Sequence, residues 1–239
     1  FLRLVALSTL VQITYKFKMR IVFFARVLFL CWIVFHLSAQ ATFQLNEALF
    51  QKVQDRFGVE ASKRVRDWQE VIADNKNSST ADQLYKVNRF FNRLEFVDDL
   101  KHWNKNDYWA TPVEFLATNG GDCEDFTIAK YFSLRALGVP AEKLRLMYVK
   151  ALDYNMAHMV LAYYETPSSI PLVLDNIKSD ILPANKRRDL RPVYSFNGDG
   201  LWMAKEQGRG KQVQEGGNNN LWEDLNKRKI QESNNNKDK

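Results

Sequence analysis

From residue 42 onward, apolar residues first follow a helical spacing and later a strand spacing. Between residues 42 and 75 they recur every three or four positions, which predicts helix, and Gly58 divides the run in two. A polar loop at residues 75–80 offers capping side chains to a second helical run, and Pro112 begins a shorter one. The apolar residues with this spacing are Leu49, Val53, Phe57, Val65, Trp68, Ile72, Leu84, Val87, Phe90, Phe91 and Leu94.

A pair of glycines precedes the next helical run, in the stretch Asn119-Gly120-Gly121-Asp122-Cys123-Glu124-Asp125-Phe126. We expect Gly120 and Gly121 to adopt backbone conformations that a side chain disfavours, so that the chain turns sharply. Asp122 is a good N-cap, which places Cys123 in the first turn of the helix. Apolar residues continue at helical spacing to Leu137, and Gly138-Val139-Pro140 ends the element.

After Pro140 the pattern changes to short apolar runs separated by turn residues, which predicts strands. The predicted strands are residues 144–150, 157–164, 171–177, 193–196 and 201–203. Helices followed by antiparallel strands indicate an α+β fold. Residues 42–204 suit one domain, whereas residues 205–239 are rich in Gln, Asn, Gly and Lys. We expect this tail to be disordered, apart from a helical turn at 221–225.

The first 41 residues have the layout of an upstream extension followed by a secretory signal peptide. A short basic region begins at Met19, residues 27–37 form an apolar core of 11 residues, and Ala39-Gln40-Ala41 resembles a cleavage site. An uncleaved membrane anchor is the alternative, but 11 residues are too few to span a bilayer and Arg26 interrupts any longer run. We therefore expect export and a mature chain that begins at Thr42 and does not insert into a membrane.

The predicted cleavage changes the meaning of the net charge. The whole chain carries +6, but residues 1–41 hold 5 of its 34 basic residues and none of its 28 acidic ones, which leaves 29 against 28. A mature chain near neutrality, with interleaved charges, has no signature of a nucleic-acid partner or of binding to a membrane surface.

The same cleavage removes Cys31 and leaves Cys123 as the lone cysteine of the mature chain. A lone cysteine is a candidate nucleophile, with an inert buried thiol as the alternative. Two histidines remain as candidate bases, and we favour His158, in an apolar strand, over His102, in a polar loop. Asp175 ends the apolar run 172–174 and is the candidate acid that would orient His158.

These stretches together resemble the bacterial transglutaminase-like cysteine proteases of the LapG type. The resemblance covers about residues 103–202 and rests on Gly121-Asp122-Cys123-Glu124-Asp125, Leu144-Arg145-Leu146, the strand from His158 to Tyr163, and the run from Pro171 to Asn176. It implies a papain-like core with a triad of Cys123, His158 and Asp175. It also implies a calcium-dependent periplasmic enzyme that releases a large surface adhesin of the biofilm by cutting its N-terminal region at a paired-alanine site. An inner-membrane receptor for cyclic di-GMP sequesters such enzymes through its periplasmic domain.

The acidic residues beside Cys123 admit two interpretations. Asp122, Glu124 and Asp125 suit the N-terminus of a helix and need no further function. The resemblance implies instead that they bind Ca²⁺, with Asp122 and Glu124 matching directly. A bound cation would also offset their tendency to raise the pKa of the Cys123 thiol. Zinc is disfavoured, because one cysteine and two scattered histidines are a poor ligand set.

The reaction type, the oxyanion donors and the role of the aromatic residues each admit more than one interpretation. The same triad would serve a transglutaminase-type acyl transferase, in which an amine replaces water, and a catalytically idle, calcium-stabilised binding module is a further alternative. The Cys123 backbone N–H is the expected oxyanion donor, with Trp109 or Asn119 as candidate second donors. The aromatic residues Trp103, Tyr108 and Trp109 either belong to the core or wall a narrow cleft.

Overall fold

The computed structural model describes residues 43–197, 200–203, 212–215 and 220–234. The predicted signal peptide and its cleavage site therefore lie outside the described residues. Within the described part, no helix is both long and apolar enough to cross a membrane. The helices are α2 (Glu47–Phe57), α3 (Val59–Asn75), α4 (Thr80–Phe91), α5 (Asp99–Trp103), α6 (Pro112–Thr118), α7 (Cys123–Ala136) and α8 (Asn220–Asn234).

The first helices begin and end where the sequence predicts. Gly58 has φ of +91°, which separates α2 from α3 because side chains rarely adopt this conformation. The Ser79 side chain caps α4 by accepting from the backbone N–H of Asp82. At α6, Thr111 and Glu114 form a reciprocal capping box, with Pro112 in the first turn.

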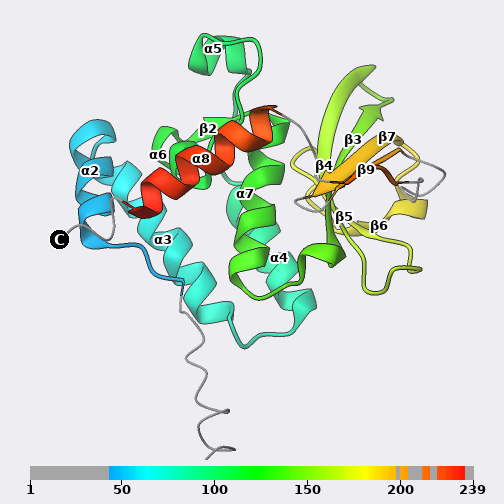
Figure 1. Ribbon diagram of the computed structural model, residues 1–239, viewed down its shortest axis with the longest axis horizontal. Coiled ribbons are helices and arrows are strands. Elements are labelled where there is room, and N and C mark those ends of the chain that lie inside the picture. Colours follow the sequence, from blue (N-terminus) through cyan, green and yellow to red (C-terminus); the bar gives the residue numbers. More distant parts are fainter. Residues whose placement is uncertain (1–42, 198–199, 204–211, 216–219, 235–239) are drawn as a thin grey trace, which may run out of the picture. The chain divides into compact units, whose positions relative to one another are not determined.

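Helix α7 lies between the other helices and the sheet, as Figure 1 shows. On its helical side, Trp68 of α3 donates from Nε1 to the Ser133 hydroxyl at 2.8 Å. On its sheet side, Thr127 donates to the backbone carbonyl of Met159 in β4 (Met156–Tyr163) at 3.1 Å. Apolar residues are buried all around the helix, which is the pattern of a central core helix rather than a surface one.

The second half of the chain forms a seven-stranded sheet in which every pairing is antiparallel. Its order is β6-β5-β4-β3-β7-β8-β9. The further strands are β3 (Leu144–Ala151), β5 (Leu172–Leu174), β6 (Leu182–Pro183), β7 (Leu190–Asn197), β8 (Gly200–Met203) and β9 (Gln212–Glu215). The α+β prediction, with helices first and antiparallel strands after them, is confirmed.

A separate two-stranded parallel pair joins β1 (Glu95–Phe96) to β2 (Gly120–Gly121). The pairing places Glu95 opposite Gly120 and Phe96 opposite Gly121. It brings the segment that contains α5 next to the start of α7, although the two are more than twenty residues apart in sequence.

Residues 220–234, which we expected to be disordered apart from a helical turn, form helix α8 instead. Trp222 and Leu225 are buried, and the Trp222 ring stacks on Phe132 of α7 with centroids 5.5 Å apart. At the other end, Arg228 pairs with Glu114 of α6. Apolar burial and this ion pair give the polar segment tertiary support that its composition does not indicate.

Candidate active site

Cys123 is the first residue of α7, and the two glycines before it lie in β2. Neither glycine has a positive φ, so the expected conformational reason for them is wrong. Space is the reason. A Cβ on Gly121 would lie 2.1 Å from Asp125 Oδ2, and one on Gly120 would lie 2.8 Å from the Glu95 carbonyl. The glycines let the strand approach the helix and its carboxylate closely.

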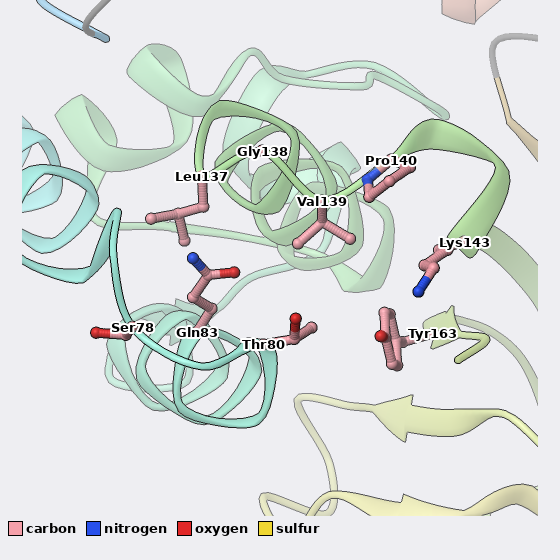
Figure 2. Close-up of a pocket in the computed structure, with 9 residues that line it drawn as sticks. All are labelled: Ser78, Thr80, Gln83, Leu137, Gly138, Val139, Pro140, Lys143 and Tyr163. Atoms are coloured by element: carbon pink, nitrogen blue, oxygen red, sulfur yellow. The ribbon is translucent and has the colours of Figure 1, made fainter. Parts of the chain in front are cut away.

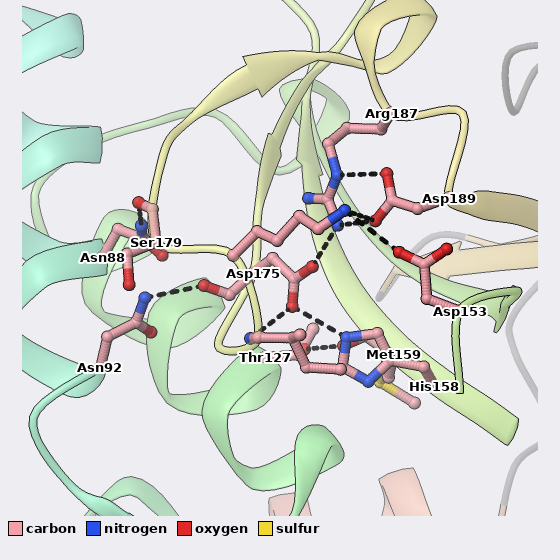
Figure 3. Close-up of polar contacts among 12 residues, drawn as sticks. Asn88, Asn92, Thr127, Asp153, His158, Met159, Asp175, Ser179, Arg187 and Asp189 are labelled. Atoms are coloured by element: carbon pink, nitrogen blue, oxygen red, sulfur yellow. Dashed lines mark hydrogen bonds and ion pairs between the residues drawn. The ribbon is translucent and has the colours of Figure 1, made fainter.

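His158 and Asp175 lie in direct contact beneath the sheet surface, each with 1% of its surface exposed. His158 Nε2 is 2.8 Å from Asp175 Oδ1, and Figure 3 shows this contact together with that of Arg187 on the same carboxylate. Asp175 Oδ1 also accepts from the backbone N–H of Ile177 at 2.9 Å. An ionised carboxylate accepts hydrogen bonds, so Nε2 is the donor of this pair.

The predicted strand 171–177 is shorter in the structure, where β5 ends at Leu174. The chain leaves the sheet at this point, and the Asp175 side chain binds His158 and Arg187. The turn is also fixed from the helical layer, since the Asn92 side chain of α4 donates to the Asp175 carbonyl at 2.7 Å. These contacts hold the Asp175 carboxylate at the end of β5, beside His158 of the neighbouring strand β4.

Cys123 lies against the strand that carries His158. The backbone of Met159, the residue after His158, is close enough to the Cys123 sulfur to act on the thiol, and it lowers the thiol pKa slightly against the larger influences that raise it. Thr127, one turn further along α7, bonds the Met159 carbonyl. The structure thus brings two of the three predicted triad residues, His158 and Asp175, into contact, and it ties the helix that begins at Cys123 to the strand that carries His158.

The environment of the thiol raises its pKa well above the ordinary value. Burial is the largest cause, followed by the charges of Glu124 and Asp122. The Cys123 thiol donates to Glu124 Oε2 at 2.7 Å, which further favours the protonated form. A helix N-terminus lowers the pKa of a thiol and neighbouring acids raise it. For Cys123, burial and the acids outweigh the helix N-terminus, and the pKa is raised.

The acids beside Cys123 form two overlapping groups. Asp122 and Glu124 lie with Cys123 in one, and Asp99, Asp122 and Asp125 lie in the other, with ligand atoms within 4.8 Å of one another. Burial and mutual repulsion raise the pKa of Asp122 to about 10 and that of Asp99 to about 6, and burial raises the pKa of Asp125 well above its usual range. Within the described part of the chain, no nearby cation offsets the repulsion among these three carboxylates.

Hard cations that take oxygen ligands fit this cluster. Asp125 Oδ1 accepts from the Ala110 backbone N–H at 2.7 Å, but its Oδ2 is buried without a hydrogen-bond partner. Asp99 Oδ2 accepts from the Tyr108 N–H, and its Oδ1 is likewise buried and unpartnered. Buried carboxylate oxygens without donors are costly, and a divalent cation would satisfy them.

Sequence reasoning missed Asp99. This residue lies in α5, and the pairing of β1 with β2 brings α5 to the start of α7. A two-residue strand pair leaves no periodic pattern, and two aspartates at the start of a short helix are typical of ordinary capping. The sequence carries no local signal that would have assigned Asp99 to the cluster.

The other candidates lie apart from the histidine and carboxylate pair. His102 is hydrogen-bonded through Nε2 to Thr118 Oγ1 at 2.8 Å. Trp109 is a core residue, 1% exposed, and stacks on Phe196 with centroids 5.5 Å apart. Asn119 ends α6 in a left-handed conformation, with its amide 3.5 Å from Glu95 Oε1.

A small cavity of about 150 Å³ lies at the opposite end of α7. A helix of 14 residues is about 20 Å long, so this cavity is well removed from Cys123. Figure 2 shows its lining, which comes from the start of α4, from the residues that follow α7 and from the end of β4. The lining residues are Ser78, Thr80, Gln83, Leu137, Gly138, Val139, Pro140, Lys143 and Tyr163.

Comparison with known proteins identifies the family. The model of the bacterial transglutaminase-like cysteine proteinases, BTLCP, matches residues 58–191. Calcium-bound LapG of Legionella pneumophila is 44% identical over 75% of this chain and 97% of its own, with a TM-score of 0.66. EGTA-treated LapG of the same organism is 43% identical over 79% and 99%, with a TM-score of 0.68. A search of curated proteins found no match. The resemblance expected from the sequence is confirmed, and the chain belongs to the bacterial transglutaminase-like cysteine proteinases.

Proposed function

We propose that this protein is a calcium-dependent cysteine endopeptidase whose triad is Cys123, His158 and Asp175. The buried His158–Asp175 hydrogen bond, on a strand that Thr127 ties to the helix beginning at Cys123, is the observation that carries the proposal. Family membership supports the class of reaction, and the contacts of these side chains support their roles.

In the proposed reaction, His158 Nδ1 takes the Cys123 thiol proton while Asp175 holds the protonated Nε2. The thiolate attacks the carbonyl carbon of the scissile amide, and the backbone N–H of Cys123 donates to the developing oxyanion. His158 then gives its proton to the leaving amine as the C–N bond breaks, which leaves a thioester on Cys123. A water molecule, deprotonated by His158, hydrolyses the thioester and restores the thiol.

Asp122, Glu124 and Asp125, together with Asp99, are the residues that would hold Ca²⁺. When bound, the ion supplies positive charge close to the thiol. The unpartnered oxygens of Asp99 and Asp125 and the raised pKa of Asp122 support this assignment. The calcium-bound and EGTA-treated forms of the Legionella relative support the choice of ion.

For the substrate, we propose the N-terminal region of a large biofilm adhesin, cut at a paired-alanine site to release it from the cell surface. For control, we propose sequestration by the periplasmic domain of an inner-membrane cyclic-di-GMP receptor. Both follow from the resemblance to LapG-type enzymes, and both require the protein to be exported to the periplasm. The near-neutral charge of residues 42–239 is compatible with recognition by shape and specific contacts.

The testing experiment incubates the purified protein with the adhesin's N-terminal fragment and with a fragment in which both alanines are replaced by bulky residues. We expect one cut in the first and none in the second, and no cut in either when the receptor domain is saturating. Equal cleavage of the two fragments would reduce the proposal to a general protease. Unchanged cleavage with saturating receptor domain would remove the proposed control.

A transglutaminase-type acyl transferase remains the alternative, because the same thioester reacts with an amine as well as with water. Adding a labelled primary amine to the cleavage reaction separates the two. Hydrolysed product without label supports the peptidase, whereas label on the new carboxyl end supports acyl transfer. A thiol-directed substrate mimic that fails to label Cys123 would indicate an idle binding module.

A further inference from the structure

Arg187 is a buried cation behind the proposed triad. It follows the short 3-10 helix η2 (Ala184–Lys186) and is 3% exposed. Its Nη2 lies 2.6 Å from Asp175 Oδ2. The same guanidinium holds Asp189, with Nε 3.1 Å from Oδ1 and Nη2 2.9 Å from Oδ2. Figure 3 shows Arg187 placed between the two carboxylates.

The contacts divide the two oxygens of Asp175. Oδ1 faces His158 and the Ile177 N–H, and Oδ2 faces Arg187. Because each oxygen has its own donor on its own side, rotation of the carboxylate would break at least one charge-assisted hydrogen bond. Asn92 holds the backbone carbonyl of the same residue, and the plane of the side chain is set by the donors to Oδ1 on one side and by the Arg187 guanidinium on the other.

The guanidinium is itself held in place from the far side. Lys178 Nζ lies 2.9 Å from Asp189 Oδ2, and this ion pair holds in place the carboxylate that binds Arg187. Lys130 of α7 is a further buried cation that interacts electrostatically with Asp175. Burial raises the pKa of Asp175, but hydrogen bonds from His158 and Arg187 more than offset this and leave it lowered to about 2. Buried ion pairs add little net stability, so stability alone does not account for this chain of charges.

We propose that Arg187 is a positioning residue. It orients the Asp175 carboxylate so that His158 keeps its proton on Nε2 and leaves Nδ1 free to accept the Cys123 proton. This inference rests on the proposed triad. It adds a residue that touches neither substrate nor thiol but decides which nitrogen of His158 acts as the base.

The test reads the ring nitrogens of His158 by NMR in the purified protein with excess Ca²⁺ and no substrate. His102, which bonds Thr118, is the internal reference in the same spectrum. We expect the Nε2–H form in the wild type and a mixture of both tautomers in Arg187→Met. Arg187→Lys keeps the charge but loses the fork, so an intermediate mixture is expected.

Asn88→Ala is the matched control, because Asn88 holds the Ser179 carbonyl of the same loop at 2.8 Å without touching an ionised group. It should lower thermal stability and leave the tautomer unchanged. In cleavage assays, Arg187→Met should lower kcat about tenfold or more with KM nearly constant. A pure Nε2–H form in a folded Arg187→Met protein overturns the proposal, as does a KM effect without a kcat effect.

If Arg187→Met does not fold, the His158 tautomer of Arg187→Lys, read by the same NMR measurement, tests the proposal. A tautomer mixture in that variant supports the proposal, and a wild-type tautomer with a lower melting temperature alone overturns it. The NMR readout requires no substrate, so failure of the wild type to cut any adhesin would count against the proposed function and not against this inference.

Discussion

The Thr127 hydroxyl donates a hydrogen bond to the Met159 carbonyl at 3.1 Å, and both residues are buried. Thr127 lies one turn after Cys123 on α7, and Met159 directly follows His158 on β4. The bond therefore fixes the helix that carries the proposed nucleophile to the strand that carries the proposed base. The position of α7 relative to β4 should therefore affect both the rate of catalysis and the stability of the fold.

Thr127→Val removes this hydrogen bond while keeping the side-chain shape. We expect a loss of about 1–3 kcal/mol of unfolding free energy, because a buried carbonyl loses its donor, and a severalfold drop in kcat. Thr127→Ser keeps the hydroxyl and should behave nearly as the wild type. Thermal unfolding and cleavage rates measure both effects. A Thr127→Val protein with wild-type stability and rate would show that the junction does not depend on this bond.

Substitutions of the proposed triad should separate chemistry from folding. Cys123→Ala and His158→Ala should each abolish cleavage. Cys123→Ala should leave the melting temperature nearly unchanged, whereas His158→Ala should lower it, because the buried Asp175 carboxylate loses a hydrogen-bond donor. Asp175→Asn should lower kcat by about 10²- to 10⁴-fold, because His158 loses the group that fixes its tautomer. His102→Ala is the control and should be nearly silent in cleavage assays. Cleavage by Cys123→Ala at the wild-type rate is the result that would refute the nucleophile assignment.

Much of the fold was predictable because its signals are local. Gly58, the Thr111–Glu114 capping box and the run after Cys123 each mark an element boundary within a few residues. His158 and Asp175 were predictable as partners because candidate bases were few and both lie where predicted strands begin or end. Their contact in the structure is a consequence of antiparallel β4 and β5 lying side by side.

What the sequence did not reveal depends on contacts between distant segments. Asp99 joins the acidic cluster through the β1–β2 pair, and α8 is held by Trp222, Leu225 and its ion pairs rather than by helix propensity. Arg187 follows no recognisable motif, and its role is visible only where its guanidinium meets Asp175. Single charged residues leave no periodic pattern in a sequence.

Calcium should act through Asp99 as well as through the acids beside Cys123. A chelator should stop cleavage, and Ca²⁺ should restore it better than Mg²⁺, which gives up its waters reluctantly. Saturating Ca²⁺ at about 100 times its Kd should stabilise the fold by roughly 2.7 kcal/mol. Asp99→Asn and Asp122→Asn should each weaken this stabilisation in calcium titrations followed by thermal unfolding.

The control for the calcium prediction is Asp107→Asn, an acid near Glu124 that is not part of either candidate ligand group. It should change the calcium response less than Asp99→Asn. Full activity of a metal-free preparation in excess chelator would contradict the requirement for calcium. An unchanged calcium titration in Asp99→Asn would remove Asp99 from the ligand set.

Export should be visible in the N-terminus of the protein isolated from cells. The basic segment, the apolar core and Ala39-Gln40-Ala41 predict removal of the signal and a chain that starts at Thr42. Mass spectrometry of the periplasmic fraction measures this directly, and Ala41→Phe should block processing by enlarging the cleavage position. Intact protein that starts at Met19 in the cytoplasm would contradict the prediction.

Helix α8 should dock in a pH-dependent way through Glu232. The Thr111 hydroxyl donates to Glu232 Oε1 at 2.7 Å, and burial raises the pKa of this carboxyl from 4.5 to about 7. The charged groups around it are Glu114, Arg228 and Lys229. Because the folded state binds the proton more tightly than the unfolded state, its contribution to stability is complete below about pH 4.5 and is lost as the pH rises through about 7.

Glu232→Gln tests this sign, because glutamine keeps an oxygen for Thr111 and does not titrate. Relative to the variant, the wild type should lose unfolding free energy between pH 5 and 8, by roughly 3 kcal/mol at most for a shift of this size. Glu223→Gln, an exposed acid on the same helix, should give a curve parallel to the wild type. Thermal unfolding at constant ionic strength and saturating Ca²⁺ provides the comparison. Parallel curves for the wild type and Glu232→Gln would show that Glu232 does not titrate in this range, and that α8 is held by the stacking of Trp222 on Phe132 and the Arg228 ion pair alone.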